Sequence, residues 1–369
     1  MKSITYIGMD VHTTNYTLCC YSVEDDRYFA EIEIKPDYRE VLKYIDRIRS
    51  QRGEGAEILC GYEAGCLGYS LYHQLTYRGI ECVILAPSTM PVTPGKKIKT
   101  DRLDARRISK CLAYHTYSAV YIPTEENNAI KEYIRMRDDT NNTLKRIKQQ
   151  TIALCIRHGK QYDGKSYWTK RHLAWLDTMD LGNAVLDEVL KEYLVFYRQA
   201  QEKVDVYDKR ITELSQGGSY RESVQKLGCF IGIKEHTALA FCCEAGDFRR
   251  FSSAQRFASY LGLVPGENSS GEKQHHTGIT KAGNSHLRRL LIEAAQQYGR
   301  GAASKKSAAL KARQAGCPTH IVAYADKANE RLRRKFYRIA LRSRHNIAKT
   351  AVARELACFI WGMMPEHYT

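Results

Sequence analysis

The first 90 residues alternate between short apolar segments and polar turns, a pattern typical of a sheet with helices packed on it. Three segments rich in β-branched and aromatic residues predict consecutive antiparallel strands: 4–10, about 16–23 and about 28–35. An amphipathic helix follows, with its apolar face at Val41, Leu42, Ile45 and Ile48. A strand, a helix and a further strand are predicted next, at 57–64, about 67–78 and 81–87.

Three hairpin-linked strands followed by alternating helices and strands form the element order of a ribonuclease-H-like (RuvC-like) domain. We place this α/β domain at residues 1–125. After Gly217-Gly218 the chain changes to short apolar helical segments and Gly-rich turns, which predict a mainly helical domain at 218–369. The stretch 227–240 there is as compatible with a simple packing turn as with a helix-hairpin-helix turn that offers backbone N–H groups to phosphate.

Between these two domains, residues 126–217 contain no proline and are predicted to form a long antiparallel helical hairpin of coiled-coil character. Apolar residues in its second half follow an alternating spacing of three and four: Leu186, Val189, Tyr193, Phe196, Ala200, Tyr207 and Leu214. Lys203 and Arg210 fill the remaining positions of that seam. The pattern is as compatible with a solvated pair of surface helices as with an arm that contacts another subunit.

The charge balance indicates a nucleic-acid partner. The chain has 57 Lys and Arg against 41 Asp and Glu, a net charge of +16, as expected of a protein that neutralises phosphates. The predicted C-terminal helices carry a basic run: Arg331, Arg333, Arg334, Lys335, Arg338, Arg342 and Arg344. Such runs are usually solvated faces, but at this net charge contact with phosphates is the better interpretation, above all for Arg333 and Arg334.

The cysteines and the apolar segments indicate where the protein works. The 12 cysteines are scattered without a Cys-x-x-Cys pair, which favours reduced thiols over disulfides or a zinc site. No apolar stretch is long enough for a signal peptide or a membrane span. We therefore expect a cytoplasmic protein of a prokaryote that has no membrane partner.

Four acidic residues stand where predicted strands end or a helix begins. Asp10 ends the first strand and Glu63 the fourth, and these strands are neighbours in a ribonuclease-H-like sheet. Asp101 and Asp104 are three apart at a helix start, which puts both on one face. Singly, each would equally serve as a turn or capping residue, but their joint placement predicts one catalytic pocket. The imidazole of His12 would be a structural group or a support for the ligands.

So many carboxylates in one pocket repel each other unless cations neutralise them. All-oxygen ligation suits Mg²⁺ or Mn²⁺ better than zinc, so the four acids are predicted metal ligands. Two such ions would stabilise the entering and leaving oxygens of a phosphodiester displacement. A basic rim would draw the phosphate backbone to this pocket: Lys96, Lys97, Lys99 and Arg102.

The segment 261–291 contains Ser269 and Ser270 directly before Gly271. On turn chemistry alone, Ser-Ser-Gly is more often a turn than a nucleophile. Cationic neighbours favour a hydroxyl that attacks a phosphate, because they would bind that phosphate: Lys273, His275, His276, Lys281 and Arg288. The adjacent histidines lack nearby cysteine or acidic partners, so phosphate contact is a better interpretation for them than metal ligation.

Taken together, these motifs resemble the Piv-type, RuvC-like DEDD transposases of insertion sequences, described as bridge-RNA-guided recombinases. The strings GMDVH, GYEA and KTDRLDARRI resemble the N-terminal motifs of that family. The string GIKEHTALAFCCEAGDFRRFSSAQRFASYLGLVP and the Ser-Ser-Gly loop resemble its C-terminal transposase domain. The resemblance covers nearly the whole chain.

The resemblance implies a tetramer, a dimer of dimers, whose composite sites pair the carboxylates of one subunit with the serine of another. The serine directly before the glycine, Ser270, would attack DNA and form a phosphoserine link, with Ser269 as the alternative. Strand exchange would then join donor and target DNA. A non-coding guide RNA from the element would supply base-pairing specificity for both DNAs.

Three other functions stay open on the sequence alone. A junction-resolving nuclease would use water as the nucleophile and leave Ser270 structural. A site-specific invertase would read its DNA through the protein without a guide. A non-catalytic RNA-binding or scaffold protein could retain the fold, although the intact carboxylates disfavour it.

Overall fold

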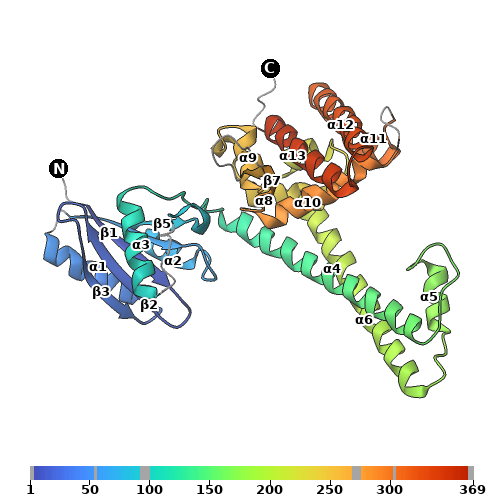
Figure 1. Cartoon of the computed structure of the whole chain (residues 1–369), viewed down its shortest axis with the longest axis horizontal. Coiled ribbons are helices and arrows are strands. Elements are labelled where there is room, and N and C mark those ends of the chain that lie inside the picture. Colours follow the sequence, from blue (N-terminus) through green and yellow to red (C-terminus); the bar gives the residue numbers. More distant parts are fainter. Residues whose placement is uncertain (1–3, 54–55, 92–99, 268–275, 302–304, 365–369) are drawn as a thin grey trace. The chain divides into compact units, whose positions relative to one another are not determined.

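The computed structural model describes residues 4–53, 56–91, 100–267, 276–301 and 305–364. They belong to two compact units, residues 1–122 and 123–369 (Figure 1). Each unit is described by itself.

The first unit is built on a five-stranded mixed sheet with the strand order β3-β2-β1-β4-β5. The strands are β1 (Ile4–Val11), β2 (Tyr16–Ser22), β3 (Arg27–Ile34), β4 (Glu57–Glu63) and β5 (Glu81–Leu85). β1, β2 and β3 pair in antiparallel fashion, whereas β4 pairs parallel with both β1 and β5. This confirms the predicted mixed α/β class, and the topology is consistent with a ribonuclease-H-like domain.

Helices pack on both faces of this sheet. Successive side chains of a strand point to opposite faces, so each face can contact a helix. Ile7 and Met9 of β1 pack on one face with α1 (Tyr38–Arg52) and α2 (Ser70–Tyr77). Tyr6, directly before Ile7, points to the other face, where it packs with Ile108 of α3 (Asp101–Ala113). A short 3₁₀ turn, η1 (Pro87–Thr89), follows β5. The acidic start of α3 therefore lies on the face that Asp10 shares with Tyr6.

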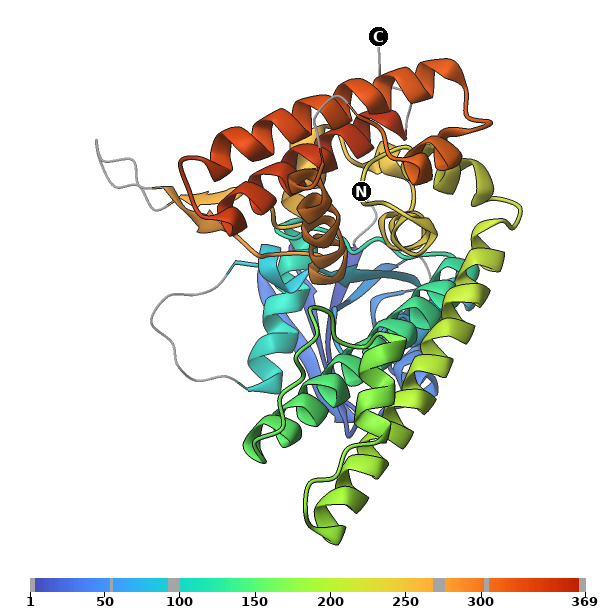
Figure 2. The ribbon, with the colours of Figure 1, turned by 90° about the vertical axis from the view of Figure 1, so that its right-hand side faces the viewer.

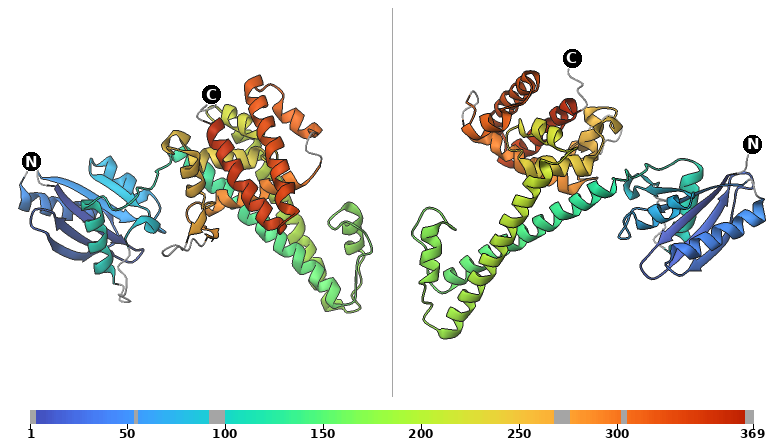
Figure 3. Two further views of the ribbon diagram at one scale, coloured as in Figure 1. Left: turned by 45° about the horizontal axis from the view of Figure 1, so that its top comes forward. Right: turned by 180° about the vertical axis from the view of Figure 1, so that it is seen from behind.

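The second unit begins with two long helices that pack against each other, α4 (Glu125–Arg157) and α6 (Ala184–Ser215) (Figures 1 and 2). Both start at a side-chain cap: Thr124 Oγ1 accepts from Asn127 N at 3.1 Å, and Asn183 Oδ1 accepts from Val185 N at 3.0 Å. The short helix α5 (Lys170–Asp177) lies at the end of this helix pair that is remote from α8 (Glu235–Ala245) and α10 (Ser285–Gln296) (Figure 3).

The apolar seam of α6 is one residue away from the predicted one. Its buried residues are Leu190, Leu194, Tyr197, Val204, Ile211 and Ser215. Of the predicted set, Phe196 is 52% exposed and Val189 is 38% exposed, while the others are half-buried. The prediction was wrong because a polar residue, Asp208, occupies a seam position, where its carboxylate pairs with Arg137 of α4 at 2.6 Å. Because this seam position is polar, a search for regularly spaced apolar residues does not find the actual heptad.

The remaining helices surround one apolar core. They are α7 (Arg221–Gly228), α8 (Glu235–Ala245), α9 (Ala254–Tyr260), α10 (Ser285–Gln296), α11 (Ala308–Gln314), α12 (Thr319–Ala340) and α13 (His345–Met363). Two 3₁₀ turns, η2 (Phe248–Arg250) and η3 (Gln297–Gly299), and a two-stranded hairpin, β6 (Pro265–Glu267) and β7 (His276–Ile279), complete the unit (Figure 2). Phe241, Phe257 and Leu332 are fully buried in the core. None of the described helices has the length and apolarity needed to cross a bilayer.

Candidate metal-binding active site

A pair of glycines brings α3 onto the sheet. Gly8 of β1 and Gly61 of β4 are partners in the parallel ladder. A Cβ on Gly8 would lie 2.2 Å from Ala105 O and 2.3 Å from Ser109 N of α3, so no side chain fits there. On Gly61 it would lie 2.8 Å from side-chain carbons of Leu112 and Leu85. Two residues further on, Asp10 and Glu63 point to the same face as these glycines.

The N-terminus of α3 is fixed beside the end of β1. Thr100 caps the helix by accepting a hydrogen bond from Leu103 N at 3.4 Å. Asp101 and Asp104 therefore lie in the first turn, where the helix dipole favours negative charge. The turn after β1 closes with a hydrogen bond from His12 N to Asn15 O at 3.0 Å, and Asn15 Nδ2 donates to Asp101 Oδ2 at 3.4 Å.

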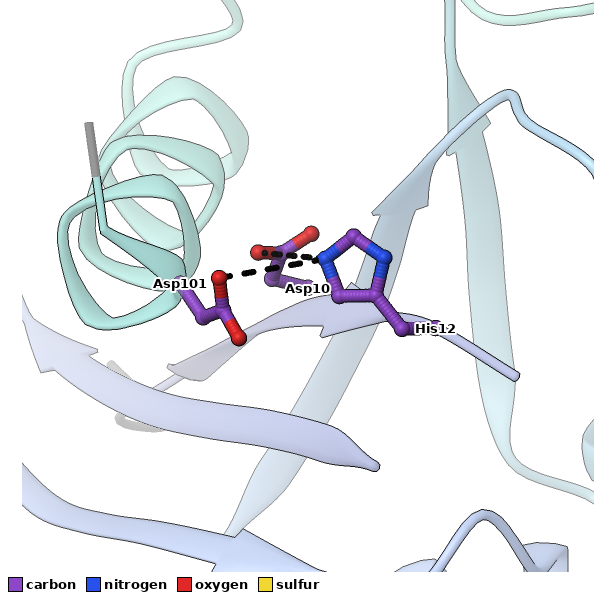
Figure 4. Close-up of side chains that lie close together, drawn as sticks. All are labelled: Asp10, His12 and Asp101. Carbon is purple, nitrogen blue, oxygen red and sulfur yellow. Dashed lines mark hydrogen bonds and ion pairs between the residues drawn. The ribbon is translucent and has the colours of Figure 1, made fainter. Parts of the chain in front are cut away.

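Asp10, His12 and Asp101 converge on one point (Figure 4). Each offers one donor atom, and these atoms lie within 4.8 Å of one another. His12 Nε2 is 3.3 Å from Asp10 Oδ2 and 3.9 Å from Asp101 Oδ1. Two carboxylate oxygens and an imidazole nitrogen at this spacing fit a divalent cation. The imidazole thus joins the oxygen ligands predicted from the sequence.

The surroundings of Asp10 disfavour its negative charge, and a bound cation would offset this effect. Burial raises the pKa of Asp10, and the nearby carboxylates of Asp104 and Asp101 raise it further, against the opposing effect of His12. A carboxylate whose ionisation is disfavoured by burial and by neighbouring carboxylates is stabilised by a bound cation. The charge distribution thus agrees with the spacing of the donor atoms.

Glu63 and Asp104, the other two predicted acids, are bridged by a cation of the protein itself. Arg107 Nη2 lies 3.0 Å from Glu63 Oε2 and 3.2 Å from Asp104 Oδ1. Asp10 and Asp101 thus converge with His12, Glu63 and Asp104 share Arg107, and Asp104 also lies near enough to Asp10 to raise its pKa. The role of Arg107 was missed from the sequence. Gly-x-Asp and Gly-x-Glu strings occur on neighbouring strands. Their glycines could have predicted from the sequence that a helix packs closely on the sheet beside the acids.

The basic rim predicted around this site is described only in part. Lys96, Lys97 and Lys99 lie outside the described residues. Arg102 is exposed on α3, and its charge helps to lower the pKa of Glu31, whose main partner is Arg106. Contact of these cations with nucleic acid stays a prediction.

The predicted nucleophiles Ser269 and Ser270 also lie outside the described residues, with Lys273 and His275, and so does the side chain of His276. The chain on either side of them is closely packed. A Cβ on Gly262 would lie 2.1 Å from Ala282 O, and one on Gly283 would lie 2.1 Å from Tyr260 O. Arg288 Nη1 donates to Leu261 O at 2.9 Å and to Ala282 O at 3.1 Å. These contacts fix the base of the β6–β7 hairpin.

Of the other cations predicted near the serines, Lys281 is exposed and has a positive φ of 56°. Arg288 is committed to the two carbonyl oxygens of the hairpin base, a structural role that the sequence did not reveal. Contact of either residue with phosphate stays a prediction.

A buried ionic cluster, also missed from the sequence, joins α4, α8 and α10. His286 Nδ1 lies 2.5 Å from Glu244 Oε1, and its Nε2 lies 2.8 Å from Asp138 Oδ2. His236 Nε2 lies 2.9 Å from the other oxygen of Asp138. Asn284 Nδ2 donates to Glu244 Oε2 at 2.8 Å, which links the cluster to the hairpin base. Arg135, Arg137 and Arg289 pair with its two carboxylates.

The cluster shifts the titration of its members. Burial alone would lower the pKa of His286, but hydrogen bonds and charges from Asp138 and Glu244 outweigh it and raise the pKa to about 9. Burial would raise the pKa of Glu244, yet His286 and Arg135 bring it down to about 2. The pKa of Asp138 is lowered in the same way, mainly by His236 and His286 acting against burial. Asp138, Glu244 and His286 are therefore charged at neutral pH.

The basic run on α12 divides into two sets. Arg334 pairs with Glu330 on the exposed surface, and Arg331 and Lys335 both pair with Glu355. Arg333 instead is 8% exposed and donates from Nη1 to Lys305 O at 2.9 Å. The run is thus not a uniform solvated face.

Known proteins are similar to this chain over most of its length. Residues 7–156 match the transposase family DEDD_Tnp_IS110, and residues 225–309 match the transposase IS116/IS110/IS902 family. The transposase for insertion sequence element IS1533 of Leptospira borgpetersenii is 32% identical over 91% of this chain and 96% of its own length. The transposase for element IS1111A of Coxiella burnetii is 25% identical over 89% of this chain and 88% of its own. The first match contains all four predicted acids, and the second contains both serines.

Proposed function

Because this chain belongs to the IS116/IS110/IS902 family of insertion-sequence transposases, we propose that it joins donor and target DNA by metal-dependent phosphodiester exchange. The observation that carries the proposal is the convergence of Asp10, Asp101 and His12 beside the Glu63 and Asp104 pair. One acidic residue would be enough to cap the helix, so capping does not explain a group of acids at the end of a sheet.

In this proposal Asp10 and Asp101 hold a divalent cation, Mg²⁺ or Mn²⁺, with His12 as a further ligand or as a support for them. The bound ion would act as a Lewis acid that offsets negative charge on the phosphate during displacement. Glu63 and Asp104 complete the carboxylate set, and Arg107 keeps their charges balanced while no phosphate is bound. Arg102 and the lysines at 96, 97 and 99 draw the backbone towards the acids.

The nucleophile in the proposal is Ser270. Its oxygen forms a bond to phosphorus, the bond from phosphorus to one deoxyribose oxygen breaks, the serine proton passes to solvent and the released oxygen gains a proton. A second exchange, in which a DNA hydroxyl attacks the phosphoserine, restores the serine and joins the strands. Each step exchanges one phosphodiester for another, so no nucleotide cofactor is required. Support comes from the matched family and from the tightly packed hairpin base on either side of the serines.

The proposal also includes a guide RNA and a tetramer, a dimer of dimers, in which one subunit supplies the carboxylates and another the serine. The net charge of +16 supports binding of more than one nucleic acid. Exposed apolar residues along α6, Val185, Phe196 and Val206, support contact between two such helical arms. Invertases and junction-resolving nucleases are the alternatives: the first needs no guide, and the second needs no serine.

The test uses the purified protein with labelled DNA carrying the element ends, a target, the RNA transcribed from the flanking non-coding region, and Mg²⁺. We expect wild-type protein to give joined DNA and an adduct of protein with DNA that survives denaturing electrophoresis. Ser270→Ala should abolish both, and Ser269→Ala should retain both. Asp10→Asn should abolish all strand breakage.

Each contrary outcome identifies a different function. Nicking by Ser270→Ala without adducts would indicate the nuclease, because water would then be the nucleophile. Full joining without the RNA would indicate an invertase, in which the protein itself reads the DNA sequence. Unchanged activity of Asp10→Asn would overturn the proposal.

A further inference from the structure

A basic pocket of about 640 Å³ lies among the C-terminal helices, and none of its lining residues is used in the proposed chemistry. Its lining comes from the turn between α7 and α8, from Gln297, Arg300 and Gly301, from residues 305–307, from α11 and from Arg333 of α12. Six cations line it: Lys234, Arg300, Lys305, Lys306, Arg313 and Arg333. Among the described residues, no acidic side chain lines it. Its volume lies in the range of sites that hold small ligands, roughly 300–1,000 Å³.

Most of this positive charge is available to a ligand. Lys234, Arg300 and Lys305 are exposed. Arg313 donates from Nε to Gly228 O at 3.0 Å, and a carbonyl oxygen orients a guanidinium without neutralising it. Lys306 is the exception, because it pairs with Asp326. The charge is therefore concentrated in the turn, in the segment after η3 and in α11.

The turn that forms one wall is rigid. Gly232 has a φ of 82°, and a Cβ there would lie 2.5 Å from Ala294 O of α10. The buried side chain of Asn329 accepts from Ile231 N and donates to Cys229 O, both at 3.0 Å. Backbone groups of the turn are thus hydrogen-bonded within the protein. This favours the packing turn over the helix-hairpin-helix alternative, in which such groups would bind phosphate. They also hold Lys234 in place without help from a ligand.

The end of α8 adds to the field in the pocket. Lys234 is the N-cap residue of α8, an 11-residue helix whose first turn receives no hydrogen bond from a capping side chain. The positive end of that helix dipole faces the same region as the cations. The acid of this first turn, Glu235, lines a neighbouring pocket together with Arg221, and Arg313 lines both pockets. Cations from three segments and a helix N-terminus at one concave surface are typical of a site for an anionic chain.

We infer that this pocket binds the sugar-phosphate backbone of a nucleic acid, with Lys234, Arg300 and Arg313 contacting phosphates. The inference rests on the proposed function only in taking nucleic acid as the partner. It assigns a role to Arg333 different from that expected of the basic run: Arg333 supports the backbone at Lys305 from beneath the pocket. The phosphodiester is common to DNA and RNA, so the experiment compares both.

The test measures binding by the full chain carrying Asp10→Asn, so that no strand is cut. The pocket variant is Lys234→Gln, Arg300→Gln and Arg313→Gln together. The control is Arg256→Gln, Lys311→Gln and Lys327→Gln, which removes the same charge from exposed positions of α9, α11 and α12 outside the pocket. Fluorescence anisotropy of labelled single-stranded and duplex DNA and RNA, at several salt concentrations, gives the affinity and its salt dependence.

Each phosphate contact contributes about 0.7–0.9 to the slope of log affinity against log salt. We expect the pocket variant to lower that slope by about 2 and the affinity at least about tenfold for one class of oligonucleotide. The class most affected identifies the source of the phosphodiester. The control variant should change the slope by less than about 1.

Equal slopes for the pocket and control variants would overturn the inference, and so would an equal loss of binding to labelled polyglutamate, which would indicate an acidic protein partner. If the pocket variant loses its helical circular dichroism, Lys305→Glu replaces it, because the side chain of this residue is exposed. A wild-type chain that cuts no DNA but binds through the pocket would refute the proposed function and leave the inference intact.

Discussion

Gly8 and Gly61 are direct partners in the parallel ladder between β1 and β4, and α3 lies across them with its backbone in contact with Gly8. Each glycine stands two residues before a predicted catalytic acid, Asp10 or Glu63. The packing of the helix and the position of the carboxylates therefore depend on the same two residues.

Gly8→Ala should misplace α3 and with it Asp101 and Asp104. The added Cβ would meet backbone atoms at 2.2 and 2.3 Å, which cannot turn away as a side chain can. We expect a loss of unfolding free energy of about 1–3 kcal/mol, as for other overpacked cores, and loss of metal-dependent strand breakage. Thermal unfolding and the cleavage assay measure these effects.

Two glycines serve as controls for this exchange. Gly61→Ala should cost less, because its Cβ would meet side-chain carbons of Leu112 and Leu85, which can move. Gly65→Ala should be nearly neutral, within about 0.5 kcal/mol, since the nearest atom is 3.8 Å away. Equal effects of all three exchanges would contradict the role assigned to Gly8.

Asp10→Asn should abolish stabilisation of the protein by Mn²⁺ without destabilising the metal-free chain. Burial and the carboxylates of Asp104 and Asp101 raise the pKa of Asp10, so removing its charge relieves repulsion. In wild-type protein, Mn²⁺ at a hundred times its dissociation constant should add about 2.7 kcal/mol of stability. The measurement is thermal unfolding with and without MnCl₂.

The exposed acid Asp46 on α1 gives the matched control, and Asp46→Asn should keep the full response to Mn²⁺. His12→Ala should weaken Mn²⁺ binding about ten- to a hundredfold, the range for a group that supports or completes a metal site. A normal Mn²⁺ response in Asp10→Asn would exclude Asp10 as a ligand.

Arg107→Gln should tighten Mn²⁺ binding and destabilise the metal-free protein. The guanidinium occupies the space between Glu63 and Asp104, where its charge repels a divalent ion and competes for the same oxygens. Arg107 and Glu63 are each about a third exposed, at 32% and 33%, so solvent screens their pairing and the cost is about 1 kcal/mol. Mn²⁺ affinity is read by electron paramagnetic resonance.

Arg107→Lys retains the charge but not the planar fork, so its Mn²⁺ affinity should stay near that of wild type while the metal-free protein is slightly less stable. The same Mn²⁺ affinity in the Gln and wild-type proteins would show that Arg107 does not compete with metal.

The stability of the second unit should decline above about pH 6.5. The pKa of His286 is raised from its ordinary value near 6.5 to about 9 in the folded protein. Its contribution is therefore complete below pH 6.5 and is lost as the pH rises through about 9. Because the pKa of Glu244 is lowered to about 2, its contribution is complete above its ordinary value and is lost only in strong acid. Urea unfolding at pH 6 and at pH 9.5 should differ by about 2–4 kcal/mol.

His286→Gln should flatten this pH dependence, since no charge then titrates between Asp138 and Glu244. The exposed His320 on α12 provides the control, and His320→Gln should leave the dependence unchanged. A steep decline that persists in His286→Gln would place the titrating group elsewhere.

Elements were predicted correctly from the sequence where their pattern depends only on residues that are neighbours in the chain. The strands of the first unit were predicted to within about two residues, because alternation and turn residues are properties of neighbours in the chain. The seam of α6 was misplaced by one residue because Asp208 owes its seam position to Arg137, which is 71 residues away in the sequence. The serines lie outside the described residues, so their part in the chemistry stays a prediction.

The sequence by itself determined the order of the strands and helices, the excess of positive charge and the acids that stand at element ends. Only the tertiary structure decided that His12 joins Asp10 and Asp101, that Arg107 bridges the other two acids, and that His286 lies between two buried carboxylates. Element identity follows from interactions between near neighbours in the chain. The partner of a charged side chain is set by whichever distant segment the fold places within a few ångströms of it.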